Sequence, residues 1–168
     1  GRWDVLEIVL AKSDVGSPTF ESLDVTQYIL TASSEDSTDL LVKLLDAGAH
    51  VNGSESTGSV PLVTAFRQTK LKIASLLLER GADPNAIERA SGDSPLHAAL
   101  AAAGSDTEQA TASFELLKSR GIPLATKLEN CAKKSAVDLC RSEELAAKLR
   151  DCHEEYKKVK KSEKKRRG

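Results

Sequence analysis

The chain has 168 residues, which is enough for one domain with a continuous hydrophobic core. Apolar residues make up 40% of it and aromatic residues only 4%, which favours small, closely stacked helices over an aromatic-rich β-sandwich. No apolar run approaches the roughly 18 residues that a membrane span needs, and no secretory signal pattern opens the sequence. The sequence contains no Met, so we expect a segment of a larger protein.

Charge is distributed unevenly along the chain, although the formal net charge is only −1. Residues 1–130 carry 11 basic and 18 acidic side chains, whereas residues 131–168 carry 13 basic and 7 acidic ones. Eight of the basic side chains lie between Lys157 and Arg167. Such an asymmetry carries information about binding partners and not about the fold.

The sequence repeats itself at a constant offset. The segment GAHVN at 48–52 returns as GADPN at 81–85, and QYILTA at 27–32 returns as VPLVTA at 60–65. Two landmarks that share one offset indicate a duplicated structural unit, and a period of about 33 residues is typical of stacked repeats. Such arrays present a long surface and usually function by binding.

The clearest unit predicts two helices followed by a turn. Pro61 begins a short helix that runs through Phe66, because the missing N–H of proline costs nothing in the first turn. Apolar residues in 71–80 recur at spacings of three and four, which predicts a helix with one buried stripe. Gly81 ends that helix, since glycine readily adopts positive φ, and a polar, turn-like segment continues to Gly92.

The following helix begins with SPLHAA at 94–99, after the stop LLxxGADxN at 77–85. This combination resembles the ankyrin repeat, whose signature is TPLHxA before the first helix and Leu-Leu with Gly-Ala-Asp after the second. The resemblance implies an all-α, ankyrin-type solenoid of stacked helix-turn-helix repeats with short hairpin-like fingers. A basic C-terminal helix would end it.

The resemblance extends over residues 1–152, leaving a basic helical tail at 153–168 that continues in the parent protein or ends there. It implies a half repeat at 1–17 and repeats at about 21–53, 55–87, 89–128 and 133–152. The repeat at 89–128 holds about seven extra residues, which we place between its helices within 103–111 as a surface loop. That loop is a second candidate contact or a disordered segment.

The repeats depart from the motif at its His position. His97 fills it in one repeat, whereas Leu30, Val63 and Asp138 stand there in the others. We expect these changes to weaken the hydrogen bonds of the turns more than the packing of the helices. The resemblance implies that His97 itself packs and hydrogen-bonds to hold its turn.

No persuasive catalytic set, cofactor motif or metal site emerges from the sequence. Cys131, Cys140 and Cys152 lack the Cys-x-x-Cys spacing of a zinc site, so we expect reduced thiols, with Cys140 and Cys152 buried in helices. Zinc bound with His153 is the alternative. Reduced thiols and the missing secretory signal favour an intracellular protein, cytoplasmic or nuclear.

The C-terminal segment predicts a long helix, because no Pro or Gly interrupts it before Gly168. Ser142 followed by two Glu residues predicts the helix start. A one-sided stripe is formed by Leu145, Leu149, Cys152, Tyr156 and Val159. The helix either caps the array and frays at its end, or begins a coiled coil. Its Lys/Arg run is a solvated surface, a nuclear-import signal or a phosphate-binding segment.

In ankyrin-like arrays the finger tips and the first helices line a concave groove in which partners dock. The resemblance therefore implies partner-binding positions at Ser56, Thr57, Ser59, Arg67, Gln68, Ala90, Ser91, Asp93, Ala101, Ala102 and Lys134. Around Ala101 and Ala102 the groove would be shallow and apolar, so a partner helix could approach closely.

These observations favour a non-catalytic protein–protein interaction module, an adaptor, scaffold or targeting segment that binds a protein or peptide in its groove as a monomer. The alternative is a nucleic-acid-associated segment whose basic end contacts phosphates, although the acidic residues 1–130 oppose broad phosphate binding. A catalytic domain ranks last, and no membrane partner is expected.

Overall fold

The computed structural model describes residues 38–46, 48–53 and 58–167, and every regular element in this part of the chain is a helix. The helices are α3 (Thr38–Asp46), α4 (Pro61–Arg67), α5 (Leu71–Glu79), α6 (Pro95–Ala103), α7 (Thr107–Lys118), α8 (Ala136–Leu139) and α9 (Glu143–Arg167). The all-helical expectation is confirmed for these residues. The half repeat expected at 1–17 and the first helix expected after Glu21 lie outside the described residues.

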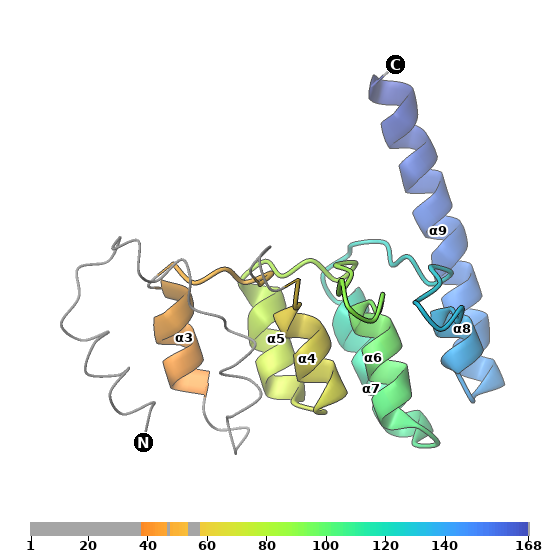
Figure 1. Ribbon diagram of the computed structural model, residues 1–168. Coiled ribbons are helices and arrows are strands. Elements are labelled where there is room, and N and C mark those ends of the chain that lie inside the picture. Colours follow the sequence, from red (N-terminus) through yellow and green to blue (C-terminus); the bar gives the residue numbers. More distant parts are fainter. Residues whose placement is uncertain (1–37, 47, 54–57, 168) are drawn as a thin grey trace.

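The helices stand side by side in a row (Figure 1). Helix α4 packs against α5 and α6, and α6 packs against α7 and α8. Helices α3, α5 and α7 are also successive neighbours, and α9 contacts α8. The row therefore has an inner layer of α4, α6 and α8 and an outer layer of α3, α5, α7 and α9.

The predicted helix starts and stops are confirmed in the clearest unit. Pro61 is the first residue of α4, and Pro95 is the first residue of α6. Gly81 follows α5 with a φ of 89°, and the N–H of Ala82 donates to the carbonyl of Leu77 at 2.9 Å. This left-handed residue and its backbone bond close the helix end.

The same helix end recurs one repeat earlier, as the sequence period requires. Gly48 follows α3 with a φ of 96°, and Ala49 N–H donates to the carbonyl of Leu44 at 3.0 Å. Asn52 then accepts the N–H of Asp83 at 2.8 Å. Its counterpart Asn85 accepts the N–H of Ala125, also at 2.8 Å. Each of these Asn side chains therefore ties its own unit to the next one.

The hydrophobic core runs along the whole row. Helix α5 buries only one face, at Ile73, Ala74, Leu77 and Leu78. Helix α6 has neighbours in both layers, and seven of its nine residues are buried. The largest fully buried side chains are Phe66 and Phe114, and burying each of them contributes about 2 kcal/mol.

The expected surface loop within 103–111 is wrong. Only 104–106 separate α6 from α7, and these two helices have 9 and 12 residues against 7 and 9 in α4 and α5. Five of the extra residues therefore lengthen the two helices. Asp106 caps α7 by accepting the N–H of Gln109 at 3.0 Å, and Ala110 and Phe114 are buried, so packing holds the longer helix in place.

Helix α9 extends well beyond the other helices of the row (Figure 1). Its first turns are buried at Leu145, Ala146, Leu149 and Cys152, and the helix continues to Arg167. Val159 is already 39% exposed. The interpretation of a helix whose start packs on the array is confirmed. Nowhere in the described residues does a helix have the length and apolar character to cross a membrane.

Candidate functional site: the fingers and the inner helices

Three connecting segments, the fingers, lie along one edge of the row (Figure 1). Their described residues are 58–60 in the first finger, 86–93 in the second and 125–134 in the third. The N–H of Arg89 donates to the carbonyl of Gly58, and the N–H of Cys131 donates to the carbonyl of Ser91, both at 3.0 Å. Neighbouring fingers are thus joined through their main chains.

The second finger is a tight hairpin that the third finger approaches closely. Glu88 N–H donates to the Asp93 carbonyl at 2.9 Å, and Gly92 N–H donates to the Glu88 carbonyl at 2.8 Å. Gly92 has a φ of 70°, and a Cβ at this position would lie 2.8 Å from the backbone nitrogen of Cys131. Both the backbone conformation and the neighbouring finger therefore require glycine here.

An ion pair links the inner helix α4 to the second finger. Arg67 Nη2 donates to Glu88 Oε2 at 2.7 Å and also lies 3.5 Å from Asp93 Oδ2. The Glu88 side chain is only 10% exposed, against 45% for Arg67. The hydrogen bond to Glu88 raises the pKa of the Arg67 guanidinium. Because the Glu88 carboxylate is nearly buried, removing Arg67 would leave its charge unpaired, which costs more than the loss of an ordinary surface salt bridge.

The polar network extends from Arg67 into the third finger. Ser91 Oγ donates to Glu88 Oε2 at 2.7 Å and accepts the N–H of Asp93 at 3.1 Å. Asn130 Nδ2 then donates to Asp93 Oδ1 at 2.8 Å. Three of the residues expected to bind a partner, Arg67, Ser91 and Asp93, are therefore brought together and bonded to one another.

Sequence reasoning missed Glu88 and Asn130, which complete this network. Glu88 is 21 residues from Arg67, and Asn130 is 37 residues from Asp93. An acid and an amide in turn-like segments are usually solvated, so their spacing gives no signal. Only the packing of successive fingers brings these side chains together.

His97 holds the third finger from within the core, which confirms its expected role. Its Nδ1 accepts the N–H of Ser94 at 3.3 Å, so Nε2 carries the proton and donates to the carbonyls of Leu128 at 2.9 Å and Lys134 at 3.1 Å. Ser94 Oγ also lies 2.7 Å from Nδ1. This neutral tautomer satisfies both ring nitrogens of a side chain that is 0% exposed.

Asp138 reproduces the His97 cap in the last unit. Ser94 and Ser135 share the same backbone conformation, with φ −87° and ψ 166°, and Asp138 accepts the N–H of Ser135 at 2.9 Å. The Ser135 hydroxyl and N–H lower the pKa of Asp138. The expected loss of turn hydrogen bonding is thus wrong at Asp138. It is confirmed at Val63, whose helix begins after Val60 with no side-chain cap.

The remaining predicted positions are spread over the fingers and the inner helices. Ala90, Ala101 and Lys134 are exposed, whereas Ser59, Gln68 and Ala102 are partly buried. Ser56 and Thr57 lie outside the described residues. Ala101 belongs to the inner helix α6 and Ala90 to the second finger, and neither takes part in the polar network.

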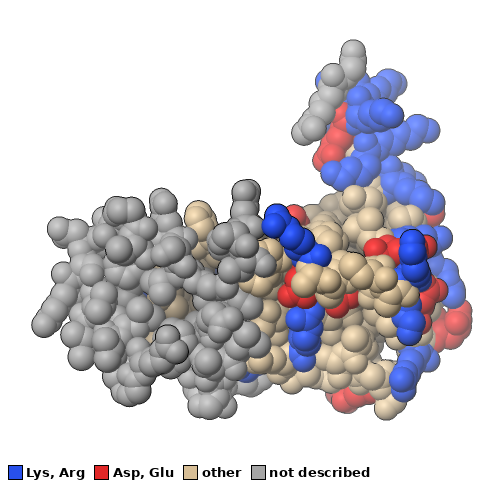
Figure 2. Space-filling model, in the orientation of Figure 1, with Lys and Arg blue, Asp and Glu red and all other residues tan. Residues whose placement is uncertain are grey.

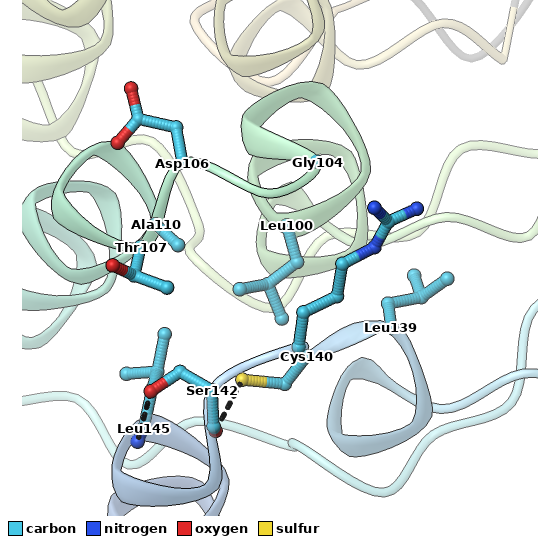
Figure 3. Close-up of a pocket in the computed structure, with 10 residues that line it drawn as sticks. Leu100, Gly104, Asp106, Thr107, Ala110, Leu139, Cys140, Ser142 and Leu145 are labelled. Carbon is cyan, nitrogen blue, oxygen red and sulfur yellow. Dashed lines mark hydrogen bonds between the residues drawn. The ribbon is translucent and has the colours of Figure 1, made fainter.

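The cavities between the last two units are small or open. Figure 3 shows a crevice where Leu100 and Gly104 face Cys140 and Leu145, and its volume of about 10 Å³ is at the lower limit for one water molecule. An open depression of about 460 Å³ lies between α7 and α9 and is lined by Thr111, among other residues. Neither has the enclosed, largely apolar form of a small-molecule site.

The three cysteines are unbridged and lie in different surroundings. Cys152 is buried in α9 as expected, whereas Cys140 is only partly buried and follows α8, where its thiol donates to the Ser142 carbonyl at 3.3 Å. Cys131 is exposed. Within the described ranges, no group of three or more His, Cys, Asp or Glu side chains is placed to hold a metal ion.

No family model matches the chain. A curated relative is the human protein "TPR and ankyrin repeat-containing protein 1", to which the chain is 35% identical over 111 residues. The aligned part is 59% of this chain and 4% of the relative, so the chain spans a small fraction of that protein. The chain is therefore similar to a segment of a repeat-containing protein, and the helices of its described part are consistent with a helical repeat protein.

Proposed function

We propose that this chain is a non-catalytic, ankyrin-type segment that binds a protein or peptide on the concave surface between its fingers and its inner helices. The single observation that carries the proposal is the continuous row of main-chain-bonded fingers beside α4 and α6. Such a row presents one surface built from several units. The repeat-containing relative and the period of the sequence support the ankyrin type.

The polar network holds the fingers of this surface in fixed positions before a partner binds. Arg67 extends from α4 to the second finger, and Asn130 joins that finger to the third. These bonds fix the separation of the fingers before a partner arrives, so little conformational entropy is lost on association. Arg67 and Asp93 therefore act mainly by positioning the fingers, and the exposed Ala90, Ala101 and Lys134 supply the contacts.

The small exposed side chains set the shape of the partner. Ala101 is exposed on α6, and Ala102 beside it is partly buried. An alanine surface permits close approach of a helix or an extended peptide, whereas a long side chain there would hold it away.

We assign the repeats to about 55–87, 89–128 and 133–152, in a monomeric array within the cytoplasm or nucleus.

A matched pair of substitutions tests the binding surface. Ala101→Arg places a long charged side chain on the inner helix α6, and Ala112→Arg makes the same change on the outer helix α7. Both alanines are exposed, and arginine is a good helix former, so both variants should fold normally. The immobilised full chain is used to capture proteins from cell extract, and the captured proteins are quantified.

The proposal expects Ala101→Arg to lose the captured partners and Ala112→Arg to retain them. Equal capture by both variants would show that the partner does not use the inner face. Substituting Arg67 would be a poor test, because it also breaks the bond to Glu88 and disturbs the fingers.

A further inference from the structure

The part of α9 beyond the array has two unlike faces. Exposed lysines occur at spacings of one, three, three and one, which places them within one third of the helix circumference. This basic face consists of Lys157, Lys158, Lys161, Lys164 and Lys165. The opposite side holds Glu155, Tyr156, Val159 and Glu163 together with the basic Arg166. Five of the six lysines between 157 and 165 therefore lie on one side of the helix.

The lysines of the basic face are largely unpaired. Only Lys157 has an acidic partner, Glu154, at 2.9 Å, whereas Lys158, Lys161, Lys164 and Lys165 make no ion pair within the described part of the chain. Lys160 belongs to the other side, where it pairs with Glu163 at 3.1 Å and lies 5.9 Å from the ring centre of Tyr156. Within the described residues, four of the five lysines of the basic face are thus left without an ion pair.

The array leaves this face uncovered and adds positive charge at its base. Cys152 is the last buried residue of α9, and Figure 2 shows Lys and Arg covering most of the projecting end. His153 lies next to the beginning of the face, and its pKa is lowered by burial and then by Lys157 and Lys127. Lys127 comes from the third finger, so the array contributes one basic side chain near the base of the face.

The side chains of the projecting end argue against a coiled-coil partner, a membrane surface and single-stranded nucleic acid. Val159 is the one aliphatic residue from 157 to 167, so this end has neither a coiled-coil seam nor the apolar face of a membrane-surface helix. No exposed aromatic row is present in the described part of this helix on which single-stranded bases could stack. Lysines interact with phosphates as point charges and carry little base specificity.

We propose that the basic face of α9 binds the phosphate backbone of double-stranded DNA, without sequence specificity. An α-helix is about 10–12 Å wide with its side chains, and the major groove of B-form DNA, about 12 Å wide, admits it. The major groove of an RNA duplex is narrow and deep and does not. This inference is independent of the concave surface, because it uses a different part of the chain.

Two double variants that remove equal charge from the same helix test the inference. Lys161→Gln with Lys165→Gln acts on the basic face, and Lys160→Gln with Arg166→Gln acts outside it. Glutamine is a good helix former, and circular dichroism checks that α9 is retained. The probe is a fluorescent random-sequence DNA duplex, with binding to the full chain followed by anisotropy over a range of salt concentrations.

The basic-face variant should bind the DNA about tenfold more weakly. The plot of the logarithm of the association constant against the logarithm of the salt concentration should also become less steep by about 2, since two phosphate contacts are lost. The other variant should change both quantities by less than half as much. Equal losses in the two variants would overturn the proposal, because they would show attraction to net charge alone. Binding of an RNA duplex or polyglutamate as tightly as DNA would also overturn it.

Discussion

The central units and the last unit begin in the same way but end differently. Ser94 and Ser135 have identical backbone angles and both cap an inner helix, yet α6 has nine residues and α8 only four. Helix α6 has an inner-layer neighbour on each side, α4 and α8. Helix α8 packs on α6 and α9, and its Asp138 is exposed. Matched capping therefore starts both inner helices, but only α6, with an inner-layer neighbour on each side, continues beyond four residues.

The largest expected effect compares buried leucines in the two regions. Leu77 and Leu149 are both 0% exposed, and Leu77→Ala should lower the free energy of unfolding by about 4 kcal/mol. Leu149→Ala should cost about 2 kcal/mol, because the last unit can open locally without unfolding its neighbours. Urea unfolding of both variants measures the difference. Equal losses would mean that the row unfolds as one cooperative block.

Removing the His97 imidazole should have the next largest effect. His97→Ala should cost about 3 kcal/mol, because the carbonyls of Leu128 and Lys134 lose their donor and a side chain that is 0% exposed leaves a cavity. Asp138→Ala should cost much less, since Asp138 is exposed and caps only its own turn. Thermal unfolding of the two variants checks this ranking. Similar losses would show that the two caps are energetically equivalent despite their different burial.

The contact between the second and third fingers can be tested with two glycines. Gly92→Ala should cost about 2 kcal/mol, from the strained positive φ together with the collision with Cys131. Gly81→Ala should cost about 1 kcal/mol, because its φ is also positive but a Cβ there meets nothing within 4 Å. Chemical denaturation measures the loss in free energy of unfolding for both variants. The difference between the two losses gives the cost of the collision with Cys131. Equal losses would indicate that the third finger moves aside freely.

The smallest effect is a pH dependence confined to the last unit. The pKa of Asp138 is lower in the folded chain, so the folded state binds its proton less tightly than the unfolded state does. Its contribution is complete above the ordinary Asp pKa and is lost as the pH falls towards the lowered value. The stability difference between the native chain and Asp138→Asn should therefore shrink below about pH 4. A pH-independent difference would contradict this assignment.

Local signals predicted the helix boundaries well. Proline in the first turn marks the start of α4 and α6, and Gly81 marks the end of α5. These signals depend on backbone geometry within one turn, so neighbouring units hardly affect them. The start of α9 after Ser142 follows the same logic, since Ser142 Oγ accepts the N–H of Leu145 at 3.4 Å.

Predictions failed where the outcome depended on neighbours. The extra residues of the repeat at 89–128 were expected to form a surface loop, but packing of Ala110 and Phe114 made most of that segment helical. The cap formed by Asp138 was missed, because the sequence motif names His and a carboxylate can accept the same N–H.

The sequence by itself determined the repeat period, the helix starts and the one-sided burial of α5, because all of these follow from short-range periodicity and backbone preference. Only the tertiary structure decided that Arg67 pairs with Glu88 and that the lysines of α9 beyond Cys152 stay exposed. The stacking of units fixes which distant side chains meet. Burial of the first turns of α9 fixes which residues remain available to a partner.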